Sequence, residues 1–106
     1  MPASDRPLLH REAIIAAARE LIVADGLEAL SLRRLAARLG VTAPALYAHV
    51  RDKQDLLRAV AEGEFDALLA RFEQITATDP VERIKAQGRA YVQHARENQQ
   101  LFRVMF

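Results

Sequence analysis

The segment from Thr42 to Lys53 carries most of the side chains that could take part in chemistry. Tyr47 supplies a phenol, His49 an imidazole two residues later, and Lys53 an ammonium group. All three groups donate hydrogen bonds to phosphate oxygens, and an aromatic or imidazole ring can also lie against a sugar, a thymine methyl or a base edge. These residue types at this spacing therefore indicate contact with a nucleic-acid surface, without bond-breaking chemistry.

Residues for other kinds of chemistry are missing or scattered. The chain has no cysteine, so thiol nucleophiles, disulfides and thiolate metal sites are excluded. Its histidines, His10, His49 and His94, are too far apart in sequence to predict a metal site. No nucleophile motif occurs, and the acids stand at expected helix caps or on solvated faces. We therefore expect no enzymatic activity, no metal and no cofactor.

Charge is unevenly distributed along the 106 residues, although 15 Lys and Arg nearly balance 14 Asp and Glu. Residues 31–53 hold five cations and a single acid, whereas residues 5–28 hold three cations and five acids. Local positive charge is the electrostatic footprint of a phosphate-binding surface. A solvated basic face explains the same composition, and charge by itself favours that simpler interpretation.

Helical periodicity in the first half of the chain predicts three helices. The first is expected from about Leu9 to Ala24, with Gly26 as a left-handed stop. Ser31 should cap a second helix that ends at Gly40. Its buried face is expected to comprise Leu32, Leu35, Ala36 and Leu39. These residues lead directly into the segment that holds Tyr47.

The third helix should be only about two turns long, so its neighbours must hold it in place. Thr42 is its expected cap, and Pro44 falls in the first turn, where proline is tolerated. Leu46 and Val50, four residues apart, should turn inward from it. Tyr47 and His49 are then left on the outer side.

Three more helices are expected in the second half. Asp52 and Asp55 resemble a capping box that opens a long helix, and Asp79, Pro80 and Glu82 open a fifth helix after a break at residues 76–80. The long helix should bury Leu56, Leu57, Val60, Ala61, Phe65, Leu68, Phe72 and Ile75. The inner face of the fifth should be Val81, Ile84, Gly88, Tyr91, Val92 and Ala95. A sixth helix is expected to begin near Asn98, and the fold class is all-α.

Two short helices joined at Gly40 match the helix-turn-helix arrangement, in which the second of the pair enters the DNA major groove. Small residues, Ala43 and Ala45, would allow close approach to DNA, and Lys53 could hold a phosphate together with backbone N–H groups at the next helix start. Taken alone, Tyr47 is explained equally well as a half-buried aromatic with a solvated hydroxyl.

Residues from about Arg11 to Val60 resemble the DNA-binding domain of the TetR family of transcriptional regulators, above all in "LEALSLRRLAARLGVTAPALYAHVRDKQDLLRAV". The shared features are the "DG" stop, the small-residue entry to the third helix and the "LYAHVRDKQDLL" segment. The resemblance implies DNA contacts at Arg33, Thr42, Ala43, Ala45, Tyr47, His49 and Lys53. Because Ala43 and Ala45 lack polar groups, specificity would depend on Arg33, Thr42, thymine methyl groups and DNA shape.

The resemblance also implies a helix-turn-helix DNA-binding domain at residues 1–58. A long linking helix then leads into a partial α-helical ligand-binding and dimerisation domain at residues 59–106. The complete form should be a cytoplasmic homodimer that binds a palindromic operator in double-stranded DNA, acts as a repressor and responds to an unidentified small-molecule effector. Phe72, Tyr91, Phe102 and Met105 could line part of an effector pocket, although their spacing favours a place in the core.

Two further expectations concern the surroundings of the chain. No apolar run approaches the roughly 20 residues that a membrane-spanning helix needs, so no membrane partner is expected. The apolar ending "LFRVMF" lacks an obvious polar covering, which indicates a partner or a continuation of the chain. The alternative function is therefore a truncated TetR-like helical interaction module that pairs with another protein without specific operator binding.

Overall fold

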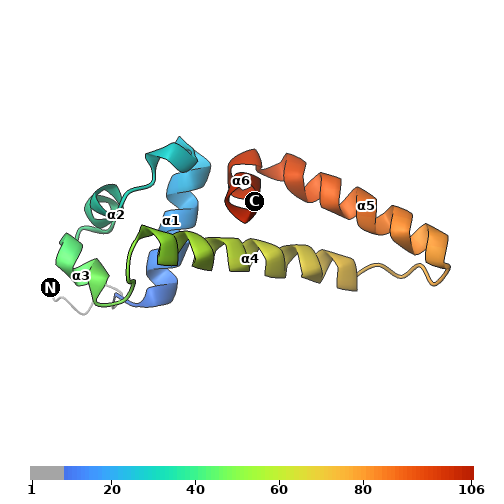
Figure 1. Ribbon diagram of the computed structural model, residues 1–106, viewed down its shortest axis with the longest axis horizontal. Coiled ribbons are helices and arrows are strands. Elements are labelled where there is room, and N and C mark those ends of the chain that lie inside the picture. Colours follow the sequence, from blue (N-terminus) through green and yellow to red (C-terminus); the bar gives the residue numbers. More distant parts are fainter. Residues whose placement is uncertain (1–8) are drawn as a thin grey trace, which may run out of the picture.

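The computed structural model describes residues 9–106, which form an all-α fold, as predicted (Figure 1). The elements are α1 (Arg11–Asp25), the 3₁₀ turn η2 (Leu27–Ala29), α2 (Leu32–Leu39), α3 (Ala43–Tyr47), α4 (Lys53–Glu73), α5 (Pro80–Glu97) and α6 (Gln99–Met105). Long α4 underlies both α1 and α6, and α5 returns beside it (Figure 1). Among these helices, none combines the length and the apolar character needed to cross a membrane.

Side-chain caps set the starts of the helices. The predicted caps Ser31, Thr42, Asp52 and Asp79 each accept a hydrogen bond from a backbone N–H three residues on, at 3.0, 3.4, 2.8 and 3.0 Å respectively. Asn98 caps α6 in the same way. His10 was not expected as a cap, but its Nδ1 accepts from the Ala13 N–H at 3.2 Å, so α1 begins at Arg11 rather than Leu9.

Glycines at positive φ end α1 and α2. Gly40 is left-handed (φ 70°, ψ 31°), as expected, and the adjacent Val41 N–H donates to the Ala36 carbonyl at 3.0 Å. Gly26 has φ 93° but ψ 160°, so the prediction of a left-handed stop there is wrong in detail. Its extended ψ leads directly into η2, a turn that the sequence pattern did not indicate.

One apolar core joins the first four helices and α6. Its members share near-complete burial: Ile14, Ala17, Ala18, Leu21 and Ile22 of α1, Leu30, Leu35, Ala36, Leu46, Val50, Leu56, Val60 and Leu101. Leu32 and Leu39 of the expected α2 face are only partly buried against it. The core lies directly beneath α2 and α3, so it fixes the segment that carries the candidate side chains.

The third and fourth helices differ from expectation in detail. Helix α3 has only five residues, so Val50 is buried as predicted but lies in the turn after the helix. Along α4 the buried positions are Leu56, Val60, Glu64 and Leu68. Because these positions recur every four residues, Phe65 lies at the edge of the buried line. It is 38% exposed, although the sequence pattern predicts it to be internal.

The predicted inner face of α5 is wrong. Val81, Ile84 and Val92 are 58%, 68% and 46% exposed, and none of the α5 residues is fully buried. The polar contacts Glu64–His94 and Arg71–Glu97 join α5 to α4 and set its rotation. Val92 is about 200° around the helix from His94, so it points away from α4. Tyr91, also on the predicted face, instead packs edge-to-face against Phe102 of α6, with ring centroids 5.7 Å apart.

The expected division of the chain at residue 58 falls inside α4, which continues without a break to Glu73. Helix α6 returns to the first half of the chain, where Leu101 enters the core and the Gln100 side chain accepts from the Leu27 N–H at 3.0 Å. The division into residues 1–58 and 59–106 stays a prediction.

Replacement of Leu46 should test whether the core holds α3. Leu46 is fully buried, so Leu46→Ala should lower the free energy of unfolding by ~2 to 5 kcal/mol, measured by urea denaturation. Ile84→Ala, at a position that is 68% exposed, is the matched control and should change it by less than ~0.5 kcal/mol. Equal effects of the two substitutions would show that Leu46 is not a core residue.

Candidate nucleic-acid interface

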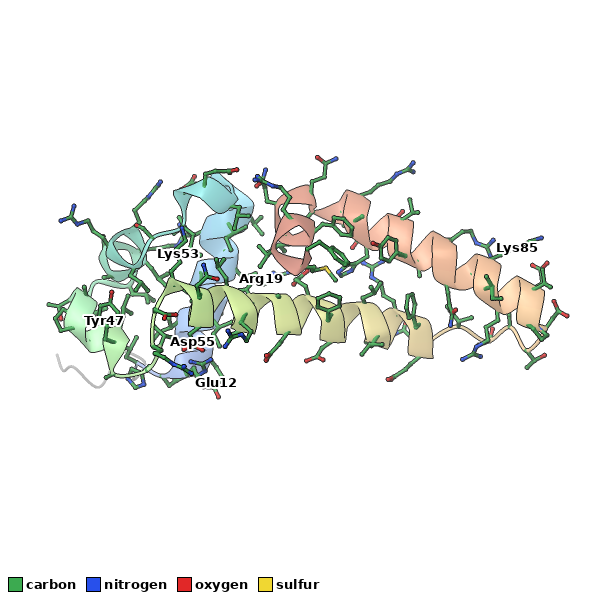
Figure 2. The ribbon with its side chains drawn as sticks, viewed as in Figure 1. Glu12, Arg19, Tyr47, Lys53, Asp55 and Lys85 are labelled. Atoms are coloured by element: carbon green, nitrogen blue, oxygen red, sulfur yellow. The ribbon has the colours of Figure 1, made fainter. Side chains whose placement is uncertain are left out.

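Helices α2 and α3 form a helix-turn-helix. The residues buried on its inner side decide which residues face outward. Leu46 is fully buried and Val50 is 2% exposed, so both anchor the α3 segment in the core. Tyr47, adjacent to Leu46, is consequently 54% exposed at the end of the molecule formed by α2 and α3 (Figure 2). The sequence alone left half-burial of Tyr47 open, and the structure favours the outward position.

All seven predicted contact residues belong to this helix-turn-helix or to the start of α4. Arg33 and Thr42 are exposed, at the first turn of α2 and at the α3 cap, and Lys53 is exposed as the first residue of α4. The others are Ala43, Ala45 and His49, which are half-buried, and Tyr47. The structure therefore gathers the whole set at one end of the molecule, and its contact with DNA stays a prediction.

Ion pairing reduces the number of cations that are available to phosphate. Arg34 donates to Asp25 at 3.1 Å, and Arg38 lies 3.9 Å from Glu20. Within residues 9–106, Arg33, Arg51 and Lys53 have no carboxylate at ion-pair distance. Arg51 was counted in the basic segment but was not predicted as a contact residue, and its exposure next to Lys53 adds it to the candidates.

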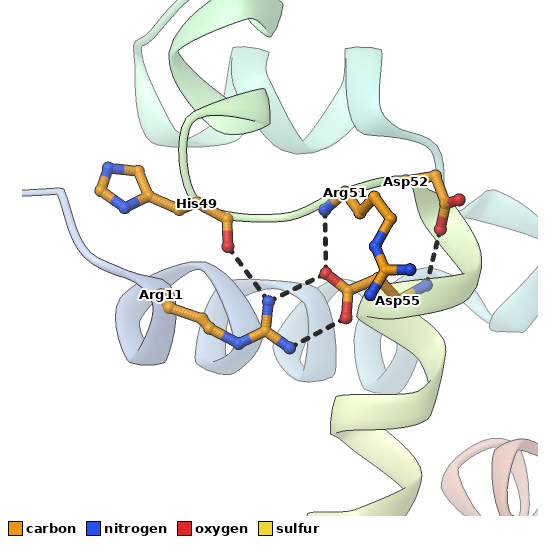
Figure 3. Close-up of polar contacts among 5 residues, drawn as sticks. All are labelled: Arg11, His49, Arg51, Asp52 and Asp55. Carbon is orange, nitrogen blue, oxygen red and sulfur yellow. Dashed lines mark hydrogen bonds and ion pairs between the residues drawn. The ribbon is translucent and has the colours of Figure 1, made fainter.

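A bidentate ion pair fixes the segment between α3 and α4 (Figure 3). The Arg11 guanidinium donates to both carboxylate oxygens of Asp55, at 2.9 and 3.0 Å, and also to the His49 carbonyl at 3.0 Å. Asp55 further accepts from the Arg51 N–H at 2.8 Å. The expected reciprocal capping box is therefore wrong, since Asp55 bonds to Arg11 and Arg51 rather than to the Asp52 N–H.

These hydrogen bonds favour the ionised form of Asp55. The Arg11 guanidinium, followed by the Arg51 N–H, holds the pKa of the Asp55 carboxyl well below its usual range. The same bond to Asp55 raises the pKa of Arg11. The His49 ring points away from this cluster while its carbonyl is held, which leaves the imidazole available at the outer side (Figure 3).

A second polar cluster surrounds Glu64, a residue that sequence reasoning missed. Glu64 is 6% exposed, accepts from Arg19 Nε at 3.0 Å and lies 3.6 Å from His94 Nε2. The cluster thereby links α1, α4 and α5. Glu64 lies four residues after Val60 and four before Leu68, so it falls on the buried line of α4. This spacing is the signal that could have identified it.

A short core-anchored helix with exposed donors, preceded by a helix and a tight glycine turn, defines the helix-turn-helix class of DNA-binding domains. Residues 14–60 match the family described as bacterial regulatory proteins, tetR family. This segment of the chain belongs to the TetR family of transcriptional regulators.

Similar proteins agree with this assignment. The tetracycline repressor protein class C of Escherichia coli is 56% identical over 54 residues, which cover 51% of this chain and 25% of the relative. The HTH-type transcriptional activator FasR of Mycolicibacterium smegmatis is 32% identical over 99 residues, which cover 92% of this chain and 45% of the relative. The chain thus spans at most about half the length of these relatives.

Solved structures share the fold beyond the matched domain. A protein of unknown function from Rhodococcus sp. RHA1 superposes with a TM-score of 0.80 at 33% identity, covering 98% of this chain and 55% of that one. BioQ, solved with its natural double-stranded DNA operator, gives a TM-score of 0.73 at 34% identity, covering 92% and 57%. Both matches extend through α4 into the second half of the chain.

The pH dependence of stability should report the Asp55 ion pair. Because the folded-state pKa of Asp55 is lowered, its contribution is complete above the unfolded-state pKa of about 3.9 and is lost as pH falls through the folded-state pKa. Asp55→Asn should therefore lower the melting temperature by a constant amount between about pH 7 and pH 5.

That difference should shrink progressively below about pH 4, because the carboxyl of the unfolded wild type then binds a proton while the folded-state carboxyl is still ionised. Glu20→Gln is the matched control, since Glu20 is exposed and lies 3.9 Å from its cation. Its effect should be small at every pH. A difference between Asp55→Asn and wild type that does not change with pH would contradict the role given to the ion pair.

Proposed function

We propose that this chain contains the DNA-reading part of a sequence-specific transcriptional regulator. It binds double-stranded DNA by inserting α3 into the major groove, while the start of α4 holds the phosphate backbone. In the complete protein, two copies related by a two-fold axis bind a palindromic operator and repress transcription until a small-molecule effector releases them.

The exposure of Tyr47 beside buried Leu46 carries this proposal. A short helix exposes a large aromatic side chain at 54%, and small residues precede it on the same helix. In residues 9–106 Arg33 and Lys53 form no ion pair, and they lie at the starts of α2 and α4, the helices before and after α3 in the chain. A groove-inserted helix with phosphate clamps on both sides needs this arrangement.

Base recognition on this surface depends on few polar groups. Ala43 and Ala45 offer methyl groups to thymine methyls but no hydrogen bonds to base edges. Arg33 and Thr42, together with Tyr47 and His49, are the donors available for direct readout. The remaining specificity then comes from the sequence-dependent shape of the DNA.

The proposals of repression and of a small-molecule effector are based on relatives of this chain. Matches to this chain include tetracycline repressors and the activator FasR, and we favour repression because the relative that is 56% identical is named a repressor. A small molecule can shift such a protein between states only if it binds the two states unequally. Helix α4 can pass that shift to the DNA-binding end, because it carries both Asp55 and Glu64.

Selection of bound sequences from a randomised duplex library, at near-physiological salt, tests the proposal. Wild-type protein should enrich a defined half-site, and a palindrome if two copies bind with α3 helices about one helical turn apart. Tyr47→Ala is the control: it should fold normally, since the residue is exposed, but lose most of the enrichment. If the wild type enriches no sequence over this variant, the chain is an interaction module rather than an operator-binding protein.

Lys53 should contribute to affinity without contributing to specificity. Lys53→Ala should weaken binding to all sequences by a similar factor and reduce the slope of log K against log salt by about one, because one phosphate contact is lost. Binding titrations at several salt concentrations measure both quantities, with Lys85→Ala at the opposite end of the molecule as the control (Figure 2). A slope equal to that of the wild type would remove Lys53 from the phosphate contacts.

A further inference from the structure

The side of α3 that faces away from the core presents mainly carbon atoms. Pro44, Tyr47 and Ala48 are all exposed there, and Ala48, which follows the last residue of α3, keeps helical backbone angles (φ −68°, ψ −20°). At about 100° per residue, Tyr47 and Ala48 lie about 60° and 40° to either side of Pro44, opposite the buried Leu46. We call these three exposed residues the outer face of α3. Neither Pro44 nor Ala48 was among the predicted contact residues.

Few hydrogen-bonding groups interrupt the outer face of α3. Its proline has no N–H, its alanine side chain is a methyl group, and the only polar side-chain atom of the three residues is the Tyr47 hydroxyl. The Thr42 hydroxyl, at the start of the helix, already accepts from the Ala45 N–H at 3.4 Å. His49 is half-buried and lies beyond the end of α3. A base edge placed against the outer face therefore meets carbon rather than a donor or an acceptor.

Cations lie in the segments before and after α3. Arg33 on α2, Arg51 in the turn after α3 and Lys53 on α4 are exposed, and within residues 9–106 none of them lies at ion-pair distance from a carboxylate. Contacts with phosphate position a protein on the duplex, whereas contacts in the groove read its sequence. The charges thus favour DNA as the occupant of the outer face, and they leave the reading of bases to its apolar side chains.

We infer that the outer face of α3 recognises the C5-methyl group of a pyrimidine, in 5-methylcytosine as well as in thymine. Both bases carry this methyl group at the same ring position in the major groove, where apolar side chains contact the methyl group of thymine. Unmethylated cytosine presents only a hydrogen atom there, so it offers the outer face less apolar surface to bury. Methyl recognition rests on the proposed function, since it concerns how the same surface reads DNA.

Methyl recognition makes affinity depend on a modification that leaves base pairing unchanged. A DNA site with cytosine at the contacted position is bound more tightly once that cytosine is methylated. Burial of one methyl group changes the dissociation constant by a factor of about four. A surface that read the same base pair only through hydrogen bonds to its edge would not distinguish the two forms, because methylation at C5 alters neither the donors nor the acceptors.

Replacement of thymine by uracil tests methyl recognition without any change to the protein. The probe is the half-site that library selection enriches, synthesised with deoxyuridine in place of one thymine at a time, which removes only the methyl group. Binding titrations should give a Kd about three- to fivefold higher where the outer face contacts that methyl group. Uracil in the flanking sequence is the control and should leave the Kd unchanged. At a contacted position, 5-methylcytosine paired with guanine should be bound about three- to fivefold more tightly than cytosine paired with guanine.

Substitutions on the outer face test whether it makes the methyl contact. In Pro44→Ala and Ala48→Gly, the ratio of the Kd for the uracil duplex to the Kd for the thymine duplex should fall toward one at the position that the missing carbon atoms contacted. A variant that folds less well loses affinity for both duplexes by the same factor, so this ratio does not depend on its stability. Ala70→Gly is the matched control and should keep the wild-type ratio, since Ala70 is exposed near the end of α4 that lies away from α3.

Failure of methyl recognition can be told apart from failure of the proposed function. A selected half-site that contains no thymine, or that binds equally well with uracil at every position, overturns methyl recognition and leaves sequence-specific binding intact. A uracil effect that both outer-face variants retain in full overturns it as well, because the methyl group then acts through the shape of the DNA. If selection enriches no half-site at all, the proposed function fails and methyl recognition fails with it.

Discussion

The bidentate Arg11–Asp55 ion pair is the contact on which the DNA-binding end depends. Helix α3 has five residues, too few to persist alone, so its orientation comes from what holds its ends. Core burial of Leu46 fixes the middle of the segment, and Arg11 fixes the exit through the His49 carbonyl and Asp55. The Asp55 carboxylate is 14% exposed, which places this pair above an ordinary solvated surface pair in strength.

A second contact of the same kind makes α1 and α4 one unit. Arg11 and Arg19 both extend from α1, and each binds an acid of α4, Asp55 near its start and Glu64 near its middle. Glu64 also meets His94 of α5. In the proposed regulator, a displacement of α5 would therefore act on α4, whose first turn positions the recognition segment. Coupling between an effector site and DNA needs such a shared element with two arrangements.

Local sequence signals predicted where most of the helices begin. Contacts between residues far apart in the sequence determine the features that those signals missed. Ser31, Thr42, Asp52 and Asp79 act on N–H groups three residues away, so their roles can be inferred from the sequence alone. Partners of Asp55 and Glu64 on α1 lie more than forty residues away, and no spacing rule connects them. The rotation of α5 is of the same kind: its apolar stripe predicted an inward face, whereas polar contacts with α4 turned part of the stripe outward. The outward position of Tyr47 was predictable because the sequence pattern turned Leu46 and Val50 inward, and both are buried.

Charge is segregated along the molecule. A net charge of +1 conceals a basic segment at residues 31–53, which holds five cations and one acid. In the proposed two-fold arrangement the two basic ends face the same way and repel each other. DNA phosphate removes that repulsion when it lies across both ends. Binding to DNA and pairing of the chains then strengthen each other by the same factor, as linkage requires, so the operator itself favours the dimer that reads it.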